Sequence, residues 1–318
     1  MKPHFLQSTD WEKYQQLEGA QTFRLDTPDF AALAILKTTP LGNYLFCPYG
    51  PTLKHSQNAD SVSTSLSLAL QALRQLAQEQ QAFFVRVEPT IPLDNQLLQT
   101  KAFTALGLKK TRDLEPAHTW VIDLTQDETT ILHQMRSSNV QYWRSHSKKG
   151  MTIRTSQNPN DVTILTSLLR GIANKDHFTP QAETHLHRQI EAGFATLYFA
   201  DYQGEILAAA LVYDDATTRF YAHAATSDKE RKLAAGTVLL VQMILDAKNR
   251  GAKTFDFWGV TTSEDPKHPW YGFSKYKRSF GGELVTYAGT WDLPLNSLRY
   301  QLYKIVRRLN RFKRKLLN

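Results

Sequence analysis

The order of strands and helices between residues 195 and 257 constrains the fold of this chain more than any other feature. The strands predicted from runs of apolar and β-branched residues are 195–200, 206–213, 218–224 and 253–257. A tight turn at 202–205 joins the first two, and a helical pattern at 233–250 precedes the last. This alternation predicts an α/β domain in which a helix packs on a sheet.

The first half of the chain repeats this order in a weaker form. The predicted elements are strands at 31–37, 44–47 and 82–87, a helix at 65–80 and a helix before Gly107. In both halves a helix leads into a strand that ends near a carboxylate, Glu88 or Asp256. The repeated order resembles that of acyltransferases of the Gcn5-related N-acetyltransferase (GNAT) class. The resemblance implies an α/β (α+β) fold of two tandem GNAT-like acyltransferase domains.

Composition narrows the class of protein. With 318 residues, 42% of them hydrophobic, the chain can bury a large core and is long for one domain. The single cysteine, Cys47, excludes an intramolecular disulfide framework and is compatible with a reducing compartment. No basic and apolar signal opens the chain, and no apolar run reaches the ~20 residues that span a bilayer. We therefore expect a cytoplasmic protein, and no cluster of metal ligands is evident.

The stretch at 255–292 carries the strongest functional signal. It begins with a β-type run that ends at Gly259, and a strand that opens onto a glycine at a sheet edge is a common place for a ligand. At 271–282, aromatic residues and three cations stand beside the pair Gly281 and Gly282. A lysine flanked by rings, next to backbone without a Cβ, suits an anion or a developing oxyanion. The alternative is a strand rich in Tyr and Phe whose cations are solvated.

These motifs resemble those of the Fem (FemXAB) family of peptidoglycan peptide-bridge aminoacyltransferases. The family has an Asp-Phe-x-Gly strand end followed by an aromatic-Phe/Tyr-Lys-x-x-Phe-Gly-Gly run, and 256–259 and 276–282 match these patterns. Four further segments resemble family motifs in the same order: Gln7-Ser8-x-x-Trp11, 45–51, 84–89 and 119–124. The ordered set covers nearly the whole chain and is more specific than any of its parts.

The resemblance implies two domains. They would comprise 1–124 plus 288–318, on the acceptor side, and 125–287. The C-terminal segment would return to the first domain, as it does in the family. Some Fem proteins also carry a coiled-coil arm. Here the region 163–193 predicts only short helices broken at Gly171 and Pro180, so the chain resembles the armless, FemX-like type.

Fem enzymes transfer an amino acid from aminoacyl-tRNA to an amine of the peptidoglycan stem peptide. Aminolysis of the activated ester needs proximity, a neutral amine and stabilisation of the tetrahedral oxyanion. The resemblance thus implies a tRNA-dependent aminoacyltransferase with aminoacyl-tRNA as co-substrate and no other cofactor. Lys277, beside Tyr276, matches the aromatic–lysine pair that would hold the ester carbonyl and its developing charge. Glu88 matches the acidic residue that would orient or deprotonate the acceptor amine.

Further residues are predicted to bind substrate. They are Trp11, Tyr49, Trp258, His223, Phe273 and Lys275. Each functional interpretation has a structural alternative. Lys277 could be a surface lysine, Glu88 a strand-end carboxylate that caps Thr90, and His223 a buried histidine with ordinary hydrogen bonds. Asp256 is predicted to hold the turn at 258–259.

Departures from the family bear on the acceptor. Members that act on the UDP-linked pentapeptide grip its diphosphate with a Lys and an Arg, whose places are taken here by Gln15 and Gln181. Lys13 or Arg188 could substitute for them. A carboxylate of the family is replaced by Thr290. We therefore expect a lipid-linked precursor (lipid II-like) rather than UDP-MurNAc-pentapeptide.

The last 20 residues are strongly basic. They carry eight cations and no acid, so the remainder of the chain has no net charge within the total of +8. Apolar residues recur among the cations at helical spacing, which predicts a basic amphipathic helix. Such a helix can dock on anionic lipid or on nucleic-acid phosphate, or it can pack on the body with a solvated charged face. We expect peripheral contact with an anionic membrane through the Arg299–Lys315 region.

Two functions from other classes fit the same residues. An acetyl- or acyl-CoA-dependent GNAT N-acyltransferase, acting on a small amine or peptide, needs backbone N–H groups before the long helix to hold pyrophosphate. The matching loop at 231–237 keeps one of the two usual glycines. A non-catalytic adaptor would use the duplicated fold only to bind a membrane or RNA. We expect a monomer whose contact with tRNA uses the body or the basic tail.

Overall fold

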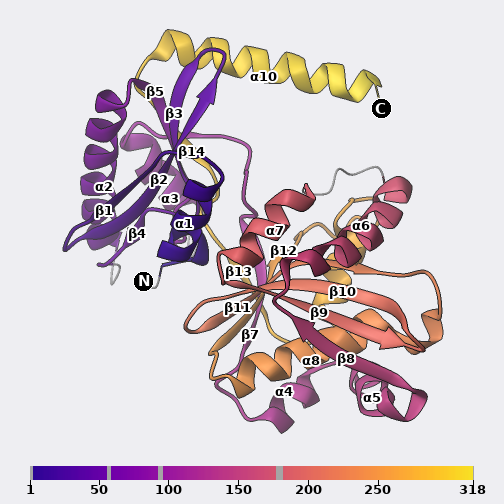
Figure 1. The fold of residues 1–318 in the computed structure, drawn as a ribbon. Helices are drawn as coiled ribbons and strands as arrows, with labels where there is room; N and C mark the ends of the chain where they lie inside the picture. The colour runs from indigo at the N-terminus through magenta and orange to yellow at the C-terminus, as the bar shows by residue number, and fades with distance from the viewer. Residues whose placement is uncertain (1–2, 56–58, 92–95, 177–181, 318) are drawn as a thin grey trace. The chain divides into compact units, whose positions relative to one another are not determined.

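The computed structural model describes residues 3–55, 59–91, 96–176 and 182–317. The chain divides into two compact units, of which the first contains 1–117 and 286–318 and the second contains 118–285 (Figure 1). The boundary predicted after residue 124 assigns β7 (His118–Asp123) to the first unit. β7 instead pairs with β12 (Thr254–Gly259) in the second sheet, so the second unit begins at residue 118. The return to the first unit occurs at 286 rather than 288.

The first unit is built on a seven-stranded sheet. Its strands are β1 (Thr22–Asp26), β2 (Phe30–Thr39), β3 (Gly42–Cys47), β4 (Thr52–Leu53), β5 (Ala82–Val87), β6 (Lys109–Lys110) and β14 (Trp291–Pro294). The strand order is β1-β2-β3-β5-β14-β6, with β4 paired to β2. β3 and β5 run parallel, and β14 enters antiparallel between β5 and β6. The segment that follows the second unit thus completes the sheet of the first.

Helices cover both faces of this sheet. They are α1 (Thr9–Leu17), α2 (Ala59–Glu79), α3 (Gln96–Ala105) and α10 (Ser297–Leu317), preceded by the 3₁₀ turn η1 (Phe5–Gln7). On one face α2 and α3 bury apolar side chains such as Leu66 and Phe103. On the other face Tyr300 and Tyr303 of α10 pack on Phe84 of β5. Within the described part of the chain, no helix has both the length and the apolar composition that crossing a bilayer requires.

The second unit places helices on both faces of another seven-stranded sheet (Figure 1). Its other strands are β8 (Met151–Ser156), β9 (Ala195–Tyr202), β10 (Glu205–Asp214), β11 (Thr218–Thr226) and β13 (Glu283–Thr286). The order is β13-β7-β12-β11-β10-β9-β8. Its helices are α4 (Glu128–Gln134), α5 (Ser137–Ser145), α6 (Val162–Asp176), α7 (Glu183–Glu191), α8 (Ala235–Asn249) and α9 (Tyr271–Arg278), with short 3₁₀ turns η2 (Ser147–Lys149), η3 (Pro159–Asp161) and η4 (Arg231–Leu233). α8 lies on one face with α4 and α5, and α6 and α7 lie on the other.

The predicted fold class is confirmed. The second unit contains the hairpin β9–β10, the strand β11, the helix α8 and the strand β12 in the predicted order. The first unit repeats this order with β2, β3, α2 and β5. In each unit the long helix connects two parallel strands, so one of its faces is buried on the sheet. The chain therefore folds as two tandem α/β units with the GNAT-like order of elements.

The prediction that Gly171 breaks a helix is wrong. α6 continues through Gly171 to Asp176. A glycine inside a helix is unfavourable by about 1 kcal/mol relative to alanine, and the burial of Val162 and Leu165 on the sheet outweighs that loss. Pro180, the other predicted break, lies outside the described residues. The longest helices that the structure describes, α2 and α10, have 21 residues each, so the described ranges contain no long coiled-coil arm.

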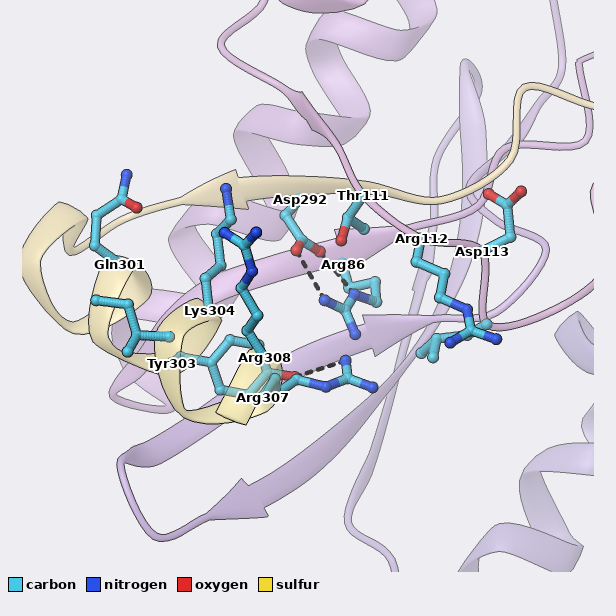
Figure 2. A pocket seen from close by; sticks show the side chains of 12 residues that line it. Arg86, Thr111, Arg112, Asp113, Asp292, Gln301, Tyr303, Lys304, Arg307 and Arg308 are labelled. Atoms are coloured by element: carbon cyan, nitrogen blue, oxygen red, sulfur yellow. Dashed lines mark hydrogen bonds and ion pairs between the residues drawn. The ribbon is translucent and has the colours of Figure 1, made fainter. Parts of the chain in front are cut away.

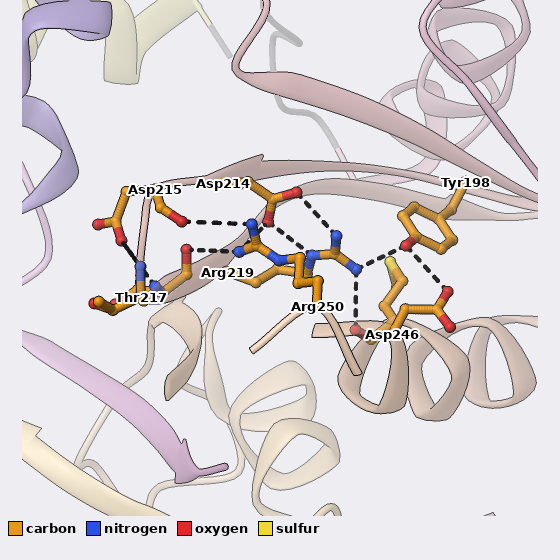
Figure 3. A network of polar contacts seen from close by, with 9 residues as sticks. Tyr198, Asp214, Asp215, Thr217, Arg219, Asp246 and Arg250 are labelled. Atoms are coloured by element: carbon orange, nitrogen blue, oxygen red, sulfur yellow. Dashed lines mark hydrogen bonds and ion pairs between the residues drawn. The ribbon is translucent and has the colours of Figure 1, made fainter. Parts of the chain in front are cut away.

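A polar network joins the sheet of the second unit to α8 (Figure 3). Arg219 of β11 is 4% exposed and donates two hydrogen bonds, of 2.8 and 2.9 Å, to the carboxylate of Asp214 on β10. Its Nη1 donates to the hydroxyl of Tyr198 at 2.7 Å and to the carbonyl of Met243 at 3.2 Å. Arg250 also lies 2.7 Å from Asp214. One carboxylate thus compensates two guanidinium groups, one of which is buried.

We expect the substitution Asp214→Asn to lower the free energy of unfolding by about 3 kcal/mol, because it leaves the buried Arg219 without a counter-charge. The matched control is Glu205→Gln, which removes the carboxylate of the exposed pair with Lys229 and should change stability by less than about 1 kcal/mol. Urea denaturation of both variants measures the difference. Equally small losses of unfolding free energy in both variants would show that the buried charge of Arg219 does not need the carboxylate of Asp214.

Candidate active site

The predicted catalytic lysine lies at the end of β12. β12 pairs in parallel with β11 over only three residues, and its register with β7 then shifts between Asp256 and Gly259. Between these two residues the strand departs from the regular ladder before it pairs with β7 again at Gly259, and the carbonyls of this stretch are available to other donors. Lys277 of α9 donates from Nζ to the carbonyl oxygens of Phe257 at 2.8 Å and Gly259 at 2.7 Å. The ammonium group is therefore fixed at the irregular end of the strand.

A buried carboxylate shapes the same strand end. The side chain of Asp256 accepts the N–H of Trp258 at 2.7 Å and a short hydrogen bond from the hydroxyl of Thr119. Trp258 has a left-handed backbone with φ 63°, which a non-glycine residue adopts only when its surroundings hold it. Burial raises the pKa of Asp256 to about 6. This geometry matches the structural role that the sequence predicts for Asp256.

Two of the three N–H groups of Lys277 are used by hydrogen bonds to described residues. Both acceptors are carbonyls of β12. Nζ also lies 5.1 Å from the centre of the Phe273 ring. Burial lowers the pKa of Lys277 to about 8, while the nearby carboxylate of Asp256 opposes that shift. The group is thus charged at neutral pH and can lose its proton in mildly alkaline solution.

The two faces of α9 have different environments. Tyr276 packs against Phe280 at 5.1 Å, and burial raises the pKa of its phenol to about 12. Phe273 is 38% exposed, and its ring lies 5.4 Å from that of Trp270, which is 40% exposed. The side chain of Lys275 is exposed. An exposed aromatic pair next to Lys277 can stack on a planar ligand such as a nucleobase. Sequence reasoning missed Trp270, although it stands directly before the motif.

The segment around α9 differs from its predicted alternative. Residues 271–278 form a helix rather than a strand rich in Tyr and Phe. Gly281 and Gly282 were expected to let the backbone approach a ligand, but they approach the protein itself. A Cβ on Gly282 would lie 2.2 Å from the carbonyl oxygen of Val121 on β7, and one on Gly281 would lie 2.8 Å from Cβ of Gln134. Both glycines have positive φ, of 79° and 90°, so the pair permits the tight turn that brings α9 onto the sheet.

Trp258 and His223 belong to one cluster on the sheet face that carries α7. The ring of Trp258 lies 6.0 Å from that of Tyr213 and 5.6 Å from that of Phe220. The Tyr213 hydroxyl lies 3.3 Å from Nε2 of His223 and donates to the amide oxygen of Gln189 at 2.8 Å. Burial lowers the pKa of His223 to about 4, so its ring is neutral. Tyr213 links the two predicted site residues, and neither Tyr213 nor its partner Gln189 belongs to a recognisable motif.

In the first unit, Glu88 lies directly after β5 and is 3% exposed. Its Oε1 accepts hydrogen bonds from the hydroxyl of Thr290 at 2.5 Å and from the amides of Leu114 at 3.3 Å and Glu115 at 3.1 Å. The alternative prediction was that Glu88 caps Thr90. Its side chain instead accepts hydrogen bonds from Thr290, Leu114 and Glu115. Its Oε2 is buried and has no hydrogen-bond partner among the residues that the structure describes. Burial raises the pKa of Glu88, while the hydrogen bonds oppose that shift.

Tyr49 and Trp11, both predicted to bind substrate, lie on the N-terminal part of the first unit. Tyr49 is 4% exposed, donates to the carbonyl of Pro116 at 2.9 Å and packs on His4 at 3.9 Å between ring centres. Trp11 of α1 is half-buried, and its ring lies 5.0 Å from that of Tyr14. The loop of Tyr49 adjoins Glu88, whose amide donates to the carbonyl of Gly50 at 2.8 Å.

A cation that sequence reasoning missed lies beside Gln15. Lys37 of β2 donates from Nζ to the side-chain oxygen of Gln15 at 3.4 Å, and burial lowers its pKa. By contrast, the side chain of Lys13 is 71% exposed and lies 4.0 Å from Asp10. The place predicted to lack a cation therefore has one, supplied by a neighbouring strand. Gln181, the second such position, lies outside the described residues.

The loop before α8 is where an acyl-CoA-dependent enzyme is predicted to hold the pyrophosphate of CoA with backbone N–H groups. The amides of Leu233, Ala234 and Thr237 all donate to carbonyls of the same loop. A Cβ on Gly236 would lie 2.5 Å from the hydroxyl oxygen of Thr226, so this glycine allows α8 to pack closely on β11. These three amides are therefore not available to a pyrophosphate, whereas the amides of Ala235 and Gly236, at the start of α8, make no such bond to the loop.

Residues 173–308 match the model of the FemAB family. The lipid II:glycine glycyltransferase of Staphylococcus haemolyticus (strain JCSC1435) is 26% identical over 186 residues, which cover 58% of this chain and 40% of that protein. The enzyme of the same name from Staphylococcus saprophyticus subsp. saprophyticus is 19% identical over an alignment of 382 residues, which covers 95% of this chain and 91% of that protein. The lipid II:glycine glycyltransferase of Staphylococcus aureus (strain COL) is 30% identical over 115 residues, which cover 36% of this chain and 27% of that protein.

Solved structures share the fold. The crystal structure of FemX superposes with a TM-score of 0.82 at 17% identity and covers 94% of both chains. The C-terminal domain of a putative lysylphosphatidylglycerol synthetase from Agrobacterium fabrum superposes with a TM-score of 0.56 at 12% identity and covers 94% of this chain and 91% of that one. At these identities the likeness establishes the arrangement of strands and helices.

We expect Lys277 to titrate with a pKa of about 8, because its ammonium group is buried. Heteronuclear NMR of the ¹³Cε and ¹Hε resonances measures this value, and Lys277→Arg identifies the signal by removing it. The substitution Asp256→Asn should lower the pKa of Lys277 further, since the carboxylate favours the charged amine. A midpoint near the ordinary lysine value of about 10.4 would contradict the environment described above.

Proposed function

The chain belongs to the Fem family, and we propose that it is a tRNA-dependent aminoacyltransferase acting on the stem peptide of a peptidoglycan precursor during cross-bridge formation. The relatives named lipid II:glycine glycyltransferase support this reaction class. The observation that carries the proposal is the position of Lys277. Two carbonyls of β12 fix its ammonium group, and its third N–H remains for a ligand beside an exposed aromatic pair.

In the proposed reaction, the acceptor amine attacks the ester carbonyl carbon of the aminoacyl-tRNA. A C–N bond forms, the carbonyl oxygen becomes an oxyanion, and the ribose hydroxyl then leaves with a proton that originates on the amine. The third N–H of Lys277 would donate to this oxyanion. Because the group is already held by Phe257 and Gly259, it would need little rearrangement when the charge develops.

The surface of α9 suits the tRNA end of the donor. Trp270 and Phe273 expose adjacent rings on which a terminal base can stack, and each base stacked on a ring contributes roughly 1–3 kcal/mol in single-strand recognition. The exposed cation Lys275 can meet the backbone phosphate. We assign these three side chains to the aminoacyl-tRNA. Trp258 and His223 are assigned to the acyl part, because their cluster adjoins the strand end that Lys277 holds.

We assign the acceptor amine to Glu88 in the first unit. An ammonium group has a favourable partner in a carboxylate, and Oε2 of Glu88 is buried without a hydrogen bond to any described residue. The raised pKa of this carboxyl group makes it a better proton acceptor than an exposed one. Thr290 and two backbone amides fix Oε1, so the remaining oxygen has a defined direction.

The acceptor is proposed to be a lipid-linked precursor rather than the UDP-linked pentapeptide. The replacement of the family's lysine by Gln15 supports this preference, while Lys37, whose Nζ lies 3.4 Å from the side-chain oxygen of Gln15, weighs against it. The basic helix α10 favours the lipid-linked form, because cations beside exposed aliphatic side chains suit peripheral contact with an anionic membrane. Tyr49 and Trp11 remain predicted contacts of this acceptor.

Transfer of radiolabelled amino acid from a mixture of charged tRNAs tests the proposal, with lipid II and the UDP-linked pentapeptide as separate acceptors. We expect label on lipid II, and we expect Lys277→Ala to reduce the rate by about 10²–10³-fold, as the loss of an oxyanion donor does. The control Lys253→Ala, which removes an exposed cation just before β12 that has no assigned role, should retain most of the rate. Thermal unfolding of both variants identifies any loss that is due to misfolding.

Other outcomes of this assay overturn separate parts of the proposal. Label on the UDP-linked pentapeptide alone would contradict the preference for a lipid-linked acceptor. Label that persists in Lys277→Ala would contradict the role of Lys277. No label on either acceptor, with every charged tRNA present, would contradict tRNA-dependent transfer and return acyl-CoA as the donor to be tested.

Glu88→Gln should lower kcat/KM for the acceptor by about 10²-fold through loss of the general base. The structural control is Thr290→Val, which removes the hydrogen bond to Oε1 and leaves the carboxylate in place. It should lower the free energy of unfolding by about 1 kcal/mol and leave kcat/KM near the wild-type value. If both variants lose stability to the same extent and neither changes the kinetics, Glu88 is a structural carboxylate.

A further inference from the structure

The first unit contains a pocket of about 670 Å³ between α10 and the sheet (Figure 2). Its lining is strongly basic, with five cations and two carboxylates: Arg86, Arg112, Lys304, Arg307, Arg308, Asp113 and Asp292. In Figure 2 the Arg86–Asp292 pair lies between Arg112 and the cations of α10. None of the assignments made for the transfer reaction uses the cations of this pocket, although Leu114, whose amide donates to Glu88, also lines it.

The floor of the pocket is a buried guanidinium group. Arg86 on β5 stands directly opposite Asp292 on β14 and is 1% exposed. Its Nε and Nη2 donate to the two oxygens of Asp292 at 2.7 and 2.8 Å, and the hydroxyl of Tyr300 donates to the same carboxylate at 2.9 Å. Nη1 of Arg86 is buried and has no hydrogen-bond partner among the described residues. A buried donor of this kind needs an acceptor, and the pocket is the space in which one can bind.

The carboxylates of the pocket do not neutralise the other cations. Asp113 is engaged with Lys110 at 3.0 Å and with the amide of Thr290 at 2.7 Å. No ion pair with a carboxylate of the described part of the chain involves Arg112, Lys304, Arg307 or Arg308. The surplus of guanidinium groups fits a phosphate, which accepts several charge-assisted hydrogen bonds at once.

The outer surface of α10 indicates where that phosphate comes from. Its exposed aliphatic residues are Leu298, Leu302, Ile305, Val306 and Leu309. At about 100° per residue they form one row, roughly opposite the buried Tyr300 and Tyr303. Single-stranded nucleic acid binds by stacking bases on exposed rings, and residues 297–310 of α10 expose none. An aliphatic row flanked by cations is typical of a helix that lies in a lipid interface.

We propose that this pocket binds the phosphate of an anionic phospholipid while the aliphatic row of α10 enters the membrane interface. The inference builds on the membrane contact proposed above and adds a defined headgroup site to it. Nη1 of Arg86 would donate to the phosphate from the floor, and Arg112 and Arg308 would donate from the two sides. The site therefore distinguishes a phosphate headgroup from negative charge in general.

Vesicle binding of the full chain tests this distinction. One set of vesicles of the phosphate-free lipid digalactosyldiacylglycerol contains phosphatidylglycerol, and a second contains oleate at the same surface charge, so that the charge is carried by a carboxylate and no phosphate is present. We expect the wild-type protein to bind phosphatidylglycerol vesicles at least about fivefold more tightly, as the engagement of one additional cation allows. Equal affinity for the two sets would overturn the headgroup site.

Three single substitutions locate the effect. Arg308→Gln and Arg112→Gln remove pocket cations from α10 and from the segment after β6, and each should abolish the preference for phosphatidylglycerol. The matched control is Arg299→Gln, since Arg299 is exposed on α10 but does not line the pocket. It should weaken binding to both vesicle sets equally. A preference that survives both pocket variants would contradict the proposal.

Further measurements distinguish binding at the pocket from the membrane contact of α10 and from binding of a phosphate that is not part of a lipid. The double variant Leu302→Ser with Leu309→Ser should weaken binding to both vesicle sets. Unchanged binding would refute the membrane contact of α10, and the pocket proposal with it. Thermal stabilisation by inorganic phosphate that depends on Arg308, without a preference between vesicles, would assign the pocket to a soluble phosphate. Binding of tRNA that depends on Arg112 and Arg308, again without a vesicle preference, would assign it to RNA.

Discussion

The early end of the parallel pairing between β11 and β12 is the constraint on which the second unit depends. After three paired residues β12 leaves its neighbour, and its last residues need partners from elsewhere. Asp256 supplies one from within the strand, and Lys277 supplies another from α9. The Gly281–Gly282 turn lets α9 come close enough for that contact. A defect in one ladder thus determines where a helix is held and where a partly dehydrated ammonium group lies.

The same logic applies to the strand end of the first unit. Glu88 follows β5 as Asp256 stands near the end of β12, and both carboxylates are buried and accept backbone amides. The two differ in what remains unsatisfied. Asp256 serves the turn of its own strand, whereas Oε2 of Glu88 has no partner in the described ranges. The duplicated fold therefore contains one buried carboxylate that holds the turn of its own strand and one whose second oxygen makes no hydrogen bond to a described residue.

Local pattern in the sequence predicted the strand and helix order of both units, because alternation and helical spacing report burial directly. It did not predict that α6 runs through Gly171, since the packing of a whole helix face outweighs the preference of one residue. It also placed the Gly-Gly pair against a ligand rather than against β7. Lys37 and Tyr213 could not be found in this way, because their partners Gln15 and His223 lie on other elements. Trp270 lies directly before the motif, but periodicity does not report that its ring is exposed beside that of Phe273.

The position of β14 between β5 and β6 has a consequence for synthesis. The second unit is continuous from 118 to 285, so all of it has been synthesised before the strand that completes the first sheet is made. Until residue 292 arrives, Arg86 lacks its carboxylate, and until residue 300 arrives, one face of β5 lacks its covering helix. Domains usually fold in the order of their synthesis. Here the unit whose translation begins first becomes complete only after the whole second unit has been made.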